Sequence, residues 1–299
     1  MKSSTVSGLL TVFQKELADF FTSWRFLILF LIVFAVGIVA IVIDAQYIRQ
    51  EVFEAQFVFL KLFTTSGQAV PLFVWFIAFF VPIVGIMLGF DTINSERNSG
   101  TMSRLLSQPI YRDAVINGKF LAGVVTIAIM LTGLVLFVSG IGLRMIGIPP
   151  TAEEAVRLMS FLIVSVIYGA FWLGIAMLFS VFFRRVATSA LASIAVWLFG
   201  GFLFLFPLLV QLEQERFVLA IMLVSPITLF WQVTTLLLDP TARTLGQMVQ
   251  SGVRVPTSAL SVGQSLLTVW PYLMSIIMLT VICFAISYIK FMRTEIRST

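Results

Sequence analysis

A group of charged residues stands between two long apolar runs, in the segment FDTINSERNSGTMSRLLSQPIYRDAVINGK at positions 90–119. Both signs of charge are present, on Asp91, Glu96, Arg97, Arg104, Arg112, Asp113 and Lys119. Side chains of opposite charge at such short spacing can form ion pairs with each other or with another protein. They do not make a lysine-rich face of the kind that binds anionic lipids. The chemistry that this segment offers is therefore recognition of another surface.

Catalytic and metal-binding residue types are scarce in the rest of the chain. Histidine is absent, and Cys283, the one cysteine, stands within an apolar run. Histidine-based catalysis, histidine metal sites and an internal disulfide are therefore excluded. The apolar runs hold no paired acids and no Cys–His set, so an intramembrane enzyme is poorly supported.

The elements that must position the charged segment are membrane helices. Of the 299 residues, 60% are hydrophobic and 11% are charged, which no single water-soluble core could accommodate. A spanning helix needs about 20 mostly apolar residues, and six runs qualify: 26–43, 71–90, 120–143, 158–183, 186–210 and 266–289. None of them contains Asp, Glu, Lys or Arg. The sequence predicts an all-α polytopic membrane protein, one transmembrane domain over 1–299, in which energy for any transport enters outside the membrane.

The distribution of basic residues predicts the orientation, since cytoplasmic loops carry the excess of Lys and Arg. With both termini in the cytoplasm, twelve of the 19 basic residues lie on that side: Lys2, Lys15, Arg25, Arg97, Arg104, Arg112, Lys119, Arg184, Arg185, Lys290, Arg293 and Arg297. The basic composition therefore reports orientation, and we expect no nucleic-acid partner. No signal-peptide pattern precedes the first run, so the amino terminus is expected to be retained.

Residues 6–22, before the first run, have apolar side chains at helical spacing, with Lys15 and Glu16 on other faces. This pattern predicts an amphipathic elbow helix that lies against lipids in the cytoplasmic interface, with Trp24 and Arg25 at head-group level. A helix packed on a soluble domain is the alternative reading. External segments are expected at 44–70, 144–157 and 211–265.

The last external segment contains an uncharged run, 217–238, that is long enough to pass as a seventh span. Pro226 in its middle favours two shorter helices with a break. A true span would also move the basic carboxyl-terminal tail to the outside, against the charge rule. We expect an external or re-entrant hairpin here, with a real span as the alternative.

Within the charged segment, 91–118, the second span is expected to continue as helix to 98–100, where Gly100 can take the left-handed conformation that ends a helix. A short helix then fits 101–107, with Met102, Leu105 and Leu106 on one apolar face. Burying each of these side chains yields about 1.5–3 kcal/mol, and a helix this short needs such a partner. The bilayer surface and a cytoplasmic protein are both candidates.

The residues ERNSGTMSRLLSQPIYR at 96–112, followed by Gly118 and Lys119, resemble the cytoplasmic motif of type 2 ATP-binding-cassette (ABC) exporter permeases. The nitrous-oxide-reductase-maturation and gliding-motility permeases are the most similar. KEL at 15–17, a Ser-Pro at 225–226 and the basic tail KFMRTEIR extend the resemblance over most of the chain. It implies a prokaryotic plasma-membrane protein whose coupling helix docks on a separate ATPase. The implied contacts are Glu96, Arg97, Gly100, Thr101, Met102, Arg104, Leu105, Leu106, Ser107, Pro109 and Arg112, with Lys15 and Glu16 on the elbow.

A nucleotide site is not expected in this chain. The one Gly-Lys pair, at 118–119, has Asp113 where a phosphate-binding loop needs its first glycine, and Phe120 where it needs Ser or Thr. ATP and Mg²⁺ are therefore expected on the partner ATPase, and no cofactor is expected in this chain.

The predicted function is the permease subunit of an ATP-driven exporter, paired with a second copy or a paralogue. The alternative is an ATPase-driven membrane scaffold that moves no substrate itself.

Overall fold

The computed structural model describes residues 2–51, 57–64, 72–101, 111–209, 225–239 and 260–293. Every regular element in these ranges is a helix, which confirms the all-α prediction. The helices are α1 (Lys2–Thr22), α2 (Trp24–Glu51), α3 (Val58–Thr64), α4 (Leu72–Gly89), α5 (Asn94–Asn98), α7 (Arg112–Ile146), α8 (Ala152–Phe182), α9 (Val186–Leu209), α11 (Pro226–Leu238) and α13 (Val262–Arg293).

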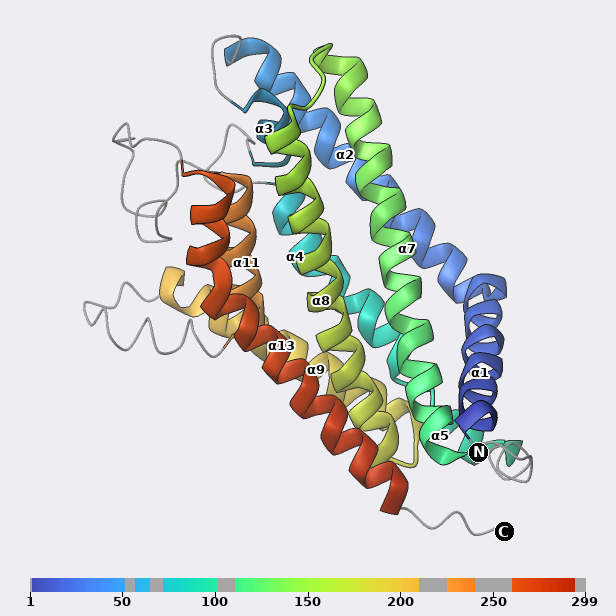
Figure 1. Ribbon diagram of the computed structural model, residues 1–299. Helices are drawn as coiled ribbons and strands as arrows, with labels where there is room; N and C mark the ends of the chain where they lie inside the picture. The colour runs from blue at the N-terminus through green and yellow to red at the C-terminus, as the bar shows by residue number, and fades with distance from the viewer. Residues whose placement is uncertain are drawn as a thin grey trace.

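Six stretches of the described residues are long and apolar enough to cross a membrane, and they lie in α2, in α4 with α5, and in α7, α8, α9 and α13. Figure 1 shows α4 and α8 in the middle of the bundle, with α1, α2 and α7 on one side and α9, α11 and α13 on the other. The start of α1, helix α5 and the end of α13 lie at one end, which we call the amino-terminal end (Figure 1). Helix α3 lies at the opposite end.

Helix α8 forms the centre because large side chains are buried along its whole length. Trp172, Tyr168 and Phe161 are fully buried, and the Tyr168 ring stacks on Phe230 of α11 with 4.2 Å between centroids. The Tyr168 hydroxyl donates a hydrogen bond to the carbonyl oxygen of Ala78 in α4 at 3.0 Å. In an apolar interior this bond satisfies a hydroxyl that would otherwise be costly to bury. Tyr168 therefore joins three helices.

Helices α4 and α8 approach each other closely through small residues. A Cβ atom added at Gly85 would lie 2.8 Å from the carbonyl oxygen of Gly169 and 2.9 Å from the backbone nitrogen of Leu173. One turn later, a Cβ at Gly89 would meet the Leu173 carbonyl at 2.9 Å. Small residues at such an interface let backbones pack tightly, which is the main attraction between helices in lipid.

We expect Gly85→Ala to destabilise the protein by about 1–3 kcal/mol, because the new methyl meets backbone atoms that cannot rotate away. The melting temperature of the purified protein in mild detergent measures the effect. Gly140→Ala is the matched control, since among the described residues a Cβ there meets no neighbouring side chain or helix within 4 Å. Equal melting temperatures for the two variants would contradict the close packing of α4 on α8.

Helix α11 is the described part of the uncharged run 217–238, which is long enough for a seventh span. It begins at Pro226, with Ser225 as its cap, so the proline occupies the first helical position, where no backbone donor is lost. Its 13 residues span about 20 Å, well below the roughly 30 Å of a hydrocarbon core. All residues from Ile227 to Leu238 are buried, against α8 and α13 among others. In the described residues this run is thus a short helix inside the bundle, as a re-entrant segment would be.

Arg157 fastens α11 to its neighbours. The sequence placed this residue in an external loop, but α8 begins at Ala152 and buries the Arg157 side chain completely. The guanidinium donates to the carbonyl oxygens of Leu237 and Leu260 at 3.0 and 2.6 Å and to the Ser265 hydroxyl at 3.1 Å. It also pairs with the Glu153 carboxylate at 2.9 Å. A cation at Leu237 suits the negative carboxyl-terminal end of α11.

Glu154 holds α3 in the same region. One carboxylate oxygen accepts hydrogen bonds from the backbone nitrogens of Phe59 and Leu60, at 2.9 and 3.4 Å, in the first turn of α3. The other oxygen accepts from the nitrogen and hydroxyl of Thr151 and completes a capping box at the start of α8. One buried carboxylate thereby caps two helices. The apolar runs contain no charge, yet charges that flank them are buried in the bundle.

Candidate functional site

The structure describes part of the predicted coupling site. Glu96, Arg97, Gly100, Thr101 and Arg112 are described, as are Lys15 and Glu16 of the elbow. The remaining predicted contacts lie outside the described residues: Met102, Arg104, Leu105, Leu106, Ser107 and Pro109. The described residues therefore form the base from which the segment 102–110 leaves α5 and returns to α7.

The first side of this base is α5. We expected one helix from the second span to residues 98–100, but α4 ends at Gly89 and α5 begins at Asn94. The Ser180 hydroxyl oxygen of α8 accepts hydrogen bonds from the nitrogens of Ile93 and Asn94, at 3.0 and 3.2 Å, and so holds the turn between the two helices. The Asn98 amide donates to the Arg184 carbonyl oxygen at 3.0 Å. These bonds tie α5 to the end of α8 and the turn that follows it.

The chain leaves α5 and enters α7 with the local geometry that the sequence predicts. Gly100 has a φ of 72°, in the left-handed region that favours glycine, and follows the end of α5. Helix α7 begins at Arg112, and the Asp113 carboxylate accepts from the Ala114 nitrogen at 2.9 Å. A carboxylate in the first turn also suits the helix dipole. At Thr101, the hydroxyl donates to the Glu96 carbonyl oxygen at 3.3 Å.

Lys119 joins the two sides of the base and the elbow helix. Its ammonium group contacts the carboxylates of Glu16, in α1, at 2.7 Å and of Glu96, in α5, at 2.8 Å. Lys15 approaches the same oxygens, at 3.0 Å for Glu16 and 3.5 Å for Glu96, and contacts Asp19 at 3.4 Å. Three helices thus meet at one set of ion pairs, and α1 is far from the other two in sequence. We call Glu16, Glu96 and Lys119 the buried clamp.

The elbow helix reaches Lys119 because the residue before it is glycine. A Cβ at Gly118 would lie 3.0 Å from the Val12 side chain and 3.3 Å from the Leu9 carbonyl oxygen. We expected α1 to lie along the membrane interface, whereas Figure 1 shows it running beside the first part of α7. The Gly-Lys pair thus has two roles: glycine gives α1 access to the α7 surface, and lysine holds it there.

Burial makes the clamp more costly to break than a surface ion pair. The Lys119 side chain is 2% exposed and that of Glu16 is 8% exposed. Burial alone would raise the pKa of Glu16, but Lys119 and then Lys15 outweigh it and lower the pKa below its usual value. For Lys15, burial alone would lower the pKa, but Glu16, Glu96 and Asp19 raise it above its usual value. Glu16 and Lys15 therefore stay charged across the neutral range.

Lys119 is the member of the site that sequence reasoning missed. Its signal was the Gly-Lys that ends the charged segment, which is part of the family motif but to which the sequence assigned no contact. Two buried atoms of the motif have no hydrogen-bond partner among the described residues: one carboxylate oxygen of Glu96, Oε2, and one guanidinium nitrogen of Arg97, Nη2. Such atoms are costly to bury alone, and both belong to the predicted coupling contacts.

Comparison with known proteins assigns the family. The family described as "ABC-2 family transporter protein" matches residues 10–296. The chain is also 29% identical, over 182 residues, to a Pseudomonas aeruginosa protein described as "Probable ABC transporter permease protein NosY". That alignment covers 60% of this chain and 62% of the relative, so it spans less than two thirds of the relative's length. The match confirms the resemblance seen in residues 96–119. Because the family match extends over nearly the whole chain, the protein belongs to the ABC-2 family of transporter proteins.

Proposed function

We propose that the chain is the membrane-spanning permease subunit of an ABC exporter, driven by a separate ATPase that docks on residues 101–109. The observation that carries the proposal is the buried clamp, which joins both ends of the segment 102–110 to the elbow helix. Membership of the ABC-2 family supports the permease role. The chain itself then performs no chemistry: ATP and Mg²⁺ are bound by the partner, and this subunit converts the partner's movement into gating.

The buried clamp is suited to transmitting a displacement from a docked partner to the helices. A partner that moves the segment 102–110 acts on α5, which precedes it, and on α7, which follows it. Glu96 and Lys119 connect these two helices at 2.8 Å, and Glu16 adds the elbow helix at 2.7 Å from Lys119. The three helices therefore move together unless buried charges separate, which is expensive. From α5 the movement reaches α8 through the bonds of Ser180 with Ile93 and Asn94.

Glu96 and Arg97 hold unsatisfied polar atoms beside the segment that is proposed to dock. One carboxylate oxygen and one guanidinium nitrogen are buried there with no hydrogen-bond partner among the described residues. Because the isolated chain already covers both atoms, a docked ATPase would reach them only by displacing α5, the movement that the proposal requires.

A second permease copy or a paralogue is proposed to complete the transport path. Helices α9 and α13 each expose large apolar side chains, among them Leu191, Phe199, Leu267 and Met278. Such a surface has to be covered by lipid or by another membrane subunit. The proposed location is the prokaryotic plasma membrane with both termini in the cytoplasm, because this orientation puts most basic residues inside.

The double substitution Leu105→Asp and Leu106→Asp is expected to release the ATPase, because it places two charges on the apolar face that docks. Each buried leucine contributes about 1.5–3 kcal/mol, so affinity should fall at least a hundredfold. Co-purification of the ATPase subunit with each variant measures the effect.

Leu105→Met with Leu106→Met is the matched control, since it keeps the apolar face and should retain the ATPase. Both variants must insert in the membrane at the level of the unaltered protein. An ATPase that co-purifies equally well with the aspartate variant would refute docking through this face.

A further inference from the structure

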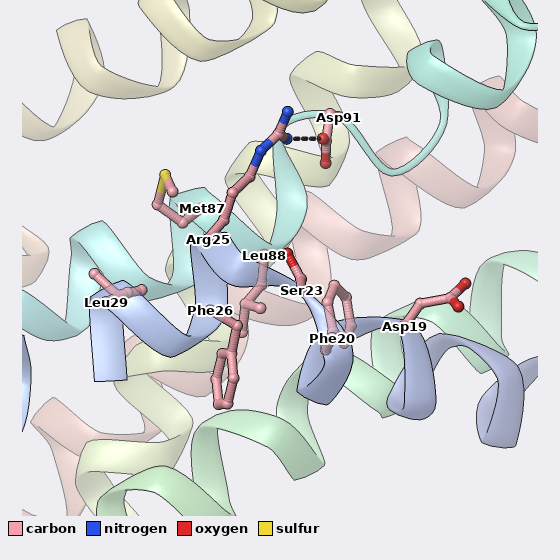
Figure 2. A pocket seen from close by; sticks show the side chains of 9 residues that line it. All are labelled: Asp19, Phe20, Ser23, Arg25, Phe26, Leu29, Met87, Leu88 and Asp91. Atoms are coloured by element: carbon pink, nitrogen blue, oxygen red, sulfur yellow. Dashed lines mark hydrogen bonds and ion pairs between the residues drawn. The ribbon is translucent and has the colours of Figure 1, made fainter. Parts of the chain in front are cut away.

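A small pocket lies beside the buried clamp, where α1 ends, α2 begins and the chain leaves α4. Its volume is about 110 Å³, and Figure 2 shows the nine side chains that line it: Asp19, Phe20, Ser23, Arg25, Phe26, Leu29, Met87, Leu88 and Asp91. A single ordered water needs only about 10–15 Å³ of such space. The pocket therefore has room for a polar group of several atoms.

The lining divides into an apolar part and a charged part. Phenylalanine, leucine and methionine side chains supply the apolar part, and Asp19, Ser23, Arg25 and Asp91 supply the polar groups. Arg25 and Asp91 form an ion pair at 3.0 Å through one guanidinium nitrogen, Nη1. Figure 2 shows this pair on one side and Asp19 apart from it, with Ser23 and Phe20 between them. The pocket thus offers a cation that is paired with one carboxylate, and a second carboxylate that lies apart from them.

The pocket stands where the apolar outer surface of α2 begins. Trp24 is 77% exposed and Arg25 has a side chain that is 70% exposed, whereas Ile28 and Leu31 continue an exposed apolar stripe along α2. An exposed tryptophan next to an arginine at the end of a spanning helix is typical of the head-group level of a membrane. A ligand that enters here can keep its tails against α2.

We propose that this pocket binds the head group of phosphatidylethanolamine. The Arg25 guanidinium has donors beyond Nη1 and binds the phosphate. The primary ammonium group donates hydrogen bonds to the Asp19 carboxylate, which is 61% exposed and whose contact with Lys15 is a long one of 3.4 Å. The acyl chains lie along the exposed side chains of Ile28 and Leu31 on α2. The site is independent of any ATPase.

The charges distinguish this lipid from other common phospholipids. Phosphatidylglycerol carries the same phosphate but no cation for Asp19, and its net negative charge meets a lining of two carboxylates and one arginine. Phosphatidylcholine is zwitterionic, yet its trimethylammonium group has no hydrogen to donate to a carboxylate. A bound phosphatidylethanolamine would brace the junction of α1 and α2. Helix α1 also carries Glu16 of the buried clamp.

The test uses the purified full-length protein, incubated with equal amounts of dioleoyl phosphatidylethanolamine, phosphatidylglycerol and phosphatidylcholine. Native mass spectrometry then measures which lipid stays bound. We expect about fivefold more phosphatidylethanolamine than either other lipid, the preference that one exposed charge pair supports. Asp19→Asn should remove the preference over phosphatidylcholine, and Arg25→Gln should reduce retention of all three lipids.

Arg185→Gln is the matched control, because Arg185 is also exposed, follows Arg184, which accepts a hydrogen bond from Asn98 of α5, and lies outside the pocket. Arg25→Lys, which keeps the charge, is the second variant in case Arg25→Gln does not fold, and it should retain the preference. Equal retention of the three lipids, a preference for phosphatidylglycerol, or the same loss in Arg185→Gln as in Arg25→Gln would each overturn the proposal. None of these readouts depends on whether an ATPase binds residues 101–109.

Discussion

Replacing Lys119 with methionine is expected to detach the elbow helix from α7 and to destabilise the protein by about 3–5 kcal/mol, which corresponds to a melting temperature lower by roughly 10 °C. The methionine removes the ammonium group that lies 2.7 Å from the carboxylate of Glu16 and 2.8 Å from that of Glu96. These two carboxylates, 8% and 16% exposed, then repel each other with only the half-exposed Lys15 left beside them. Melting in mild detergent and proteolysis of α1 measure the loss.

Lys15→Met is the matched control for this prediction. Lys15 belongs to the same set of ion pairs, but its side chain is 49% exposed, and exposed pairs contribute about 1 kcal/mol or less. The triple variant Lys119→Met, Glu16→Leu and Glu96→Leu should recover much of the stability, because replacing a whole buried ionic group with apolar residues is often neutral. If Lys15→Met and Lys119→Met cost the same, the clamp is not buried as described.

The second large effect is expected at the opposite end of the bundle. Arg157→Met should destabilise the protein by about 3 kcal/mol, because it removes the donors on which the carbonyl oxygens of Leu237 and Leu260 depend. Glu153 would lose its partner too, but its side chain is 39% exposed and water can solvate it. We expect α11 to loosen first, which faster hydrogen exchange of its backbone amides would detect.

Arg144→Met serves as the control for Arg157→Met, since Arg144 lies in the last turn of α7 with its side chain exposed. Its effect should stay within about 0.5 kcal/mol. Faster exchange spread evenly over all helices, rather than concentrated in α11, would mean that Arg157 does not act as a local fastener.

The permease hypothesis connects the two ends of the bundle through α8. At the amino-terminal end, Ser180 holds the turn before α5. In the middle, Tyr168 bonds α4 and stacks on α11, and Arg157 binds the carboxyl-terminal end of α11 at the far end. A displacement that begins at the clamp would therefore reach α11 through one rigid helix. This path is a physical chain of contacts, and the variants above test its two ends separately.

The sequence by itself determined the properties that depend on neighbouring residues. The all-α class and six candidate spans follow from the length of apolar runs, and the left-handed Gly100 and the position of Asp113 follow from local helix chemistry. The motif at 96–119 also identified the family, since the order of its residues is itself the signal. The apolar face of Met102, Leu105 and Leu106 stays a prediction, because these residues lie outside the described ranges.

Only the tertiary structure decided which charges meet. Glu16 and Lys119 are separated by 103 positions, and Arg157 and Ser265 by 108. Nothing in the local pattern of either pair shows that its members are buried together. Hydropathy placed Lys119 and Arg157 just outside apolar runs, where they read as loop residues, but α7 and α8 begin earlier and carry both into the bundle. Burial of a charge depends on partners that other helices bring, and the packing of helices is a property of the whole chain.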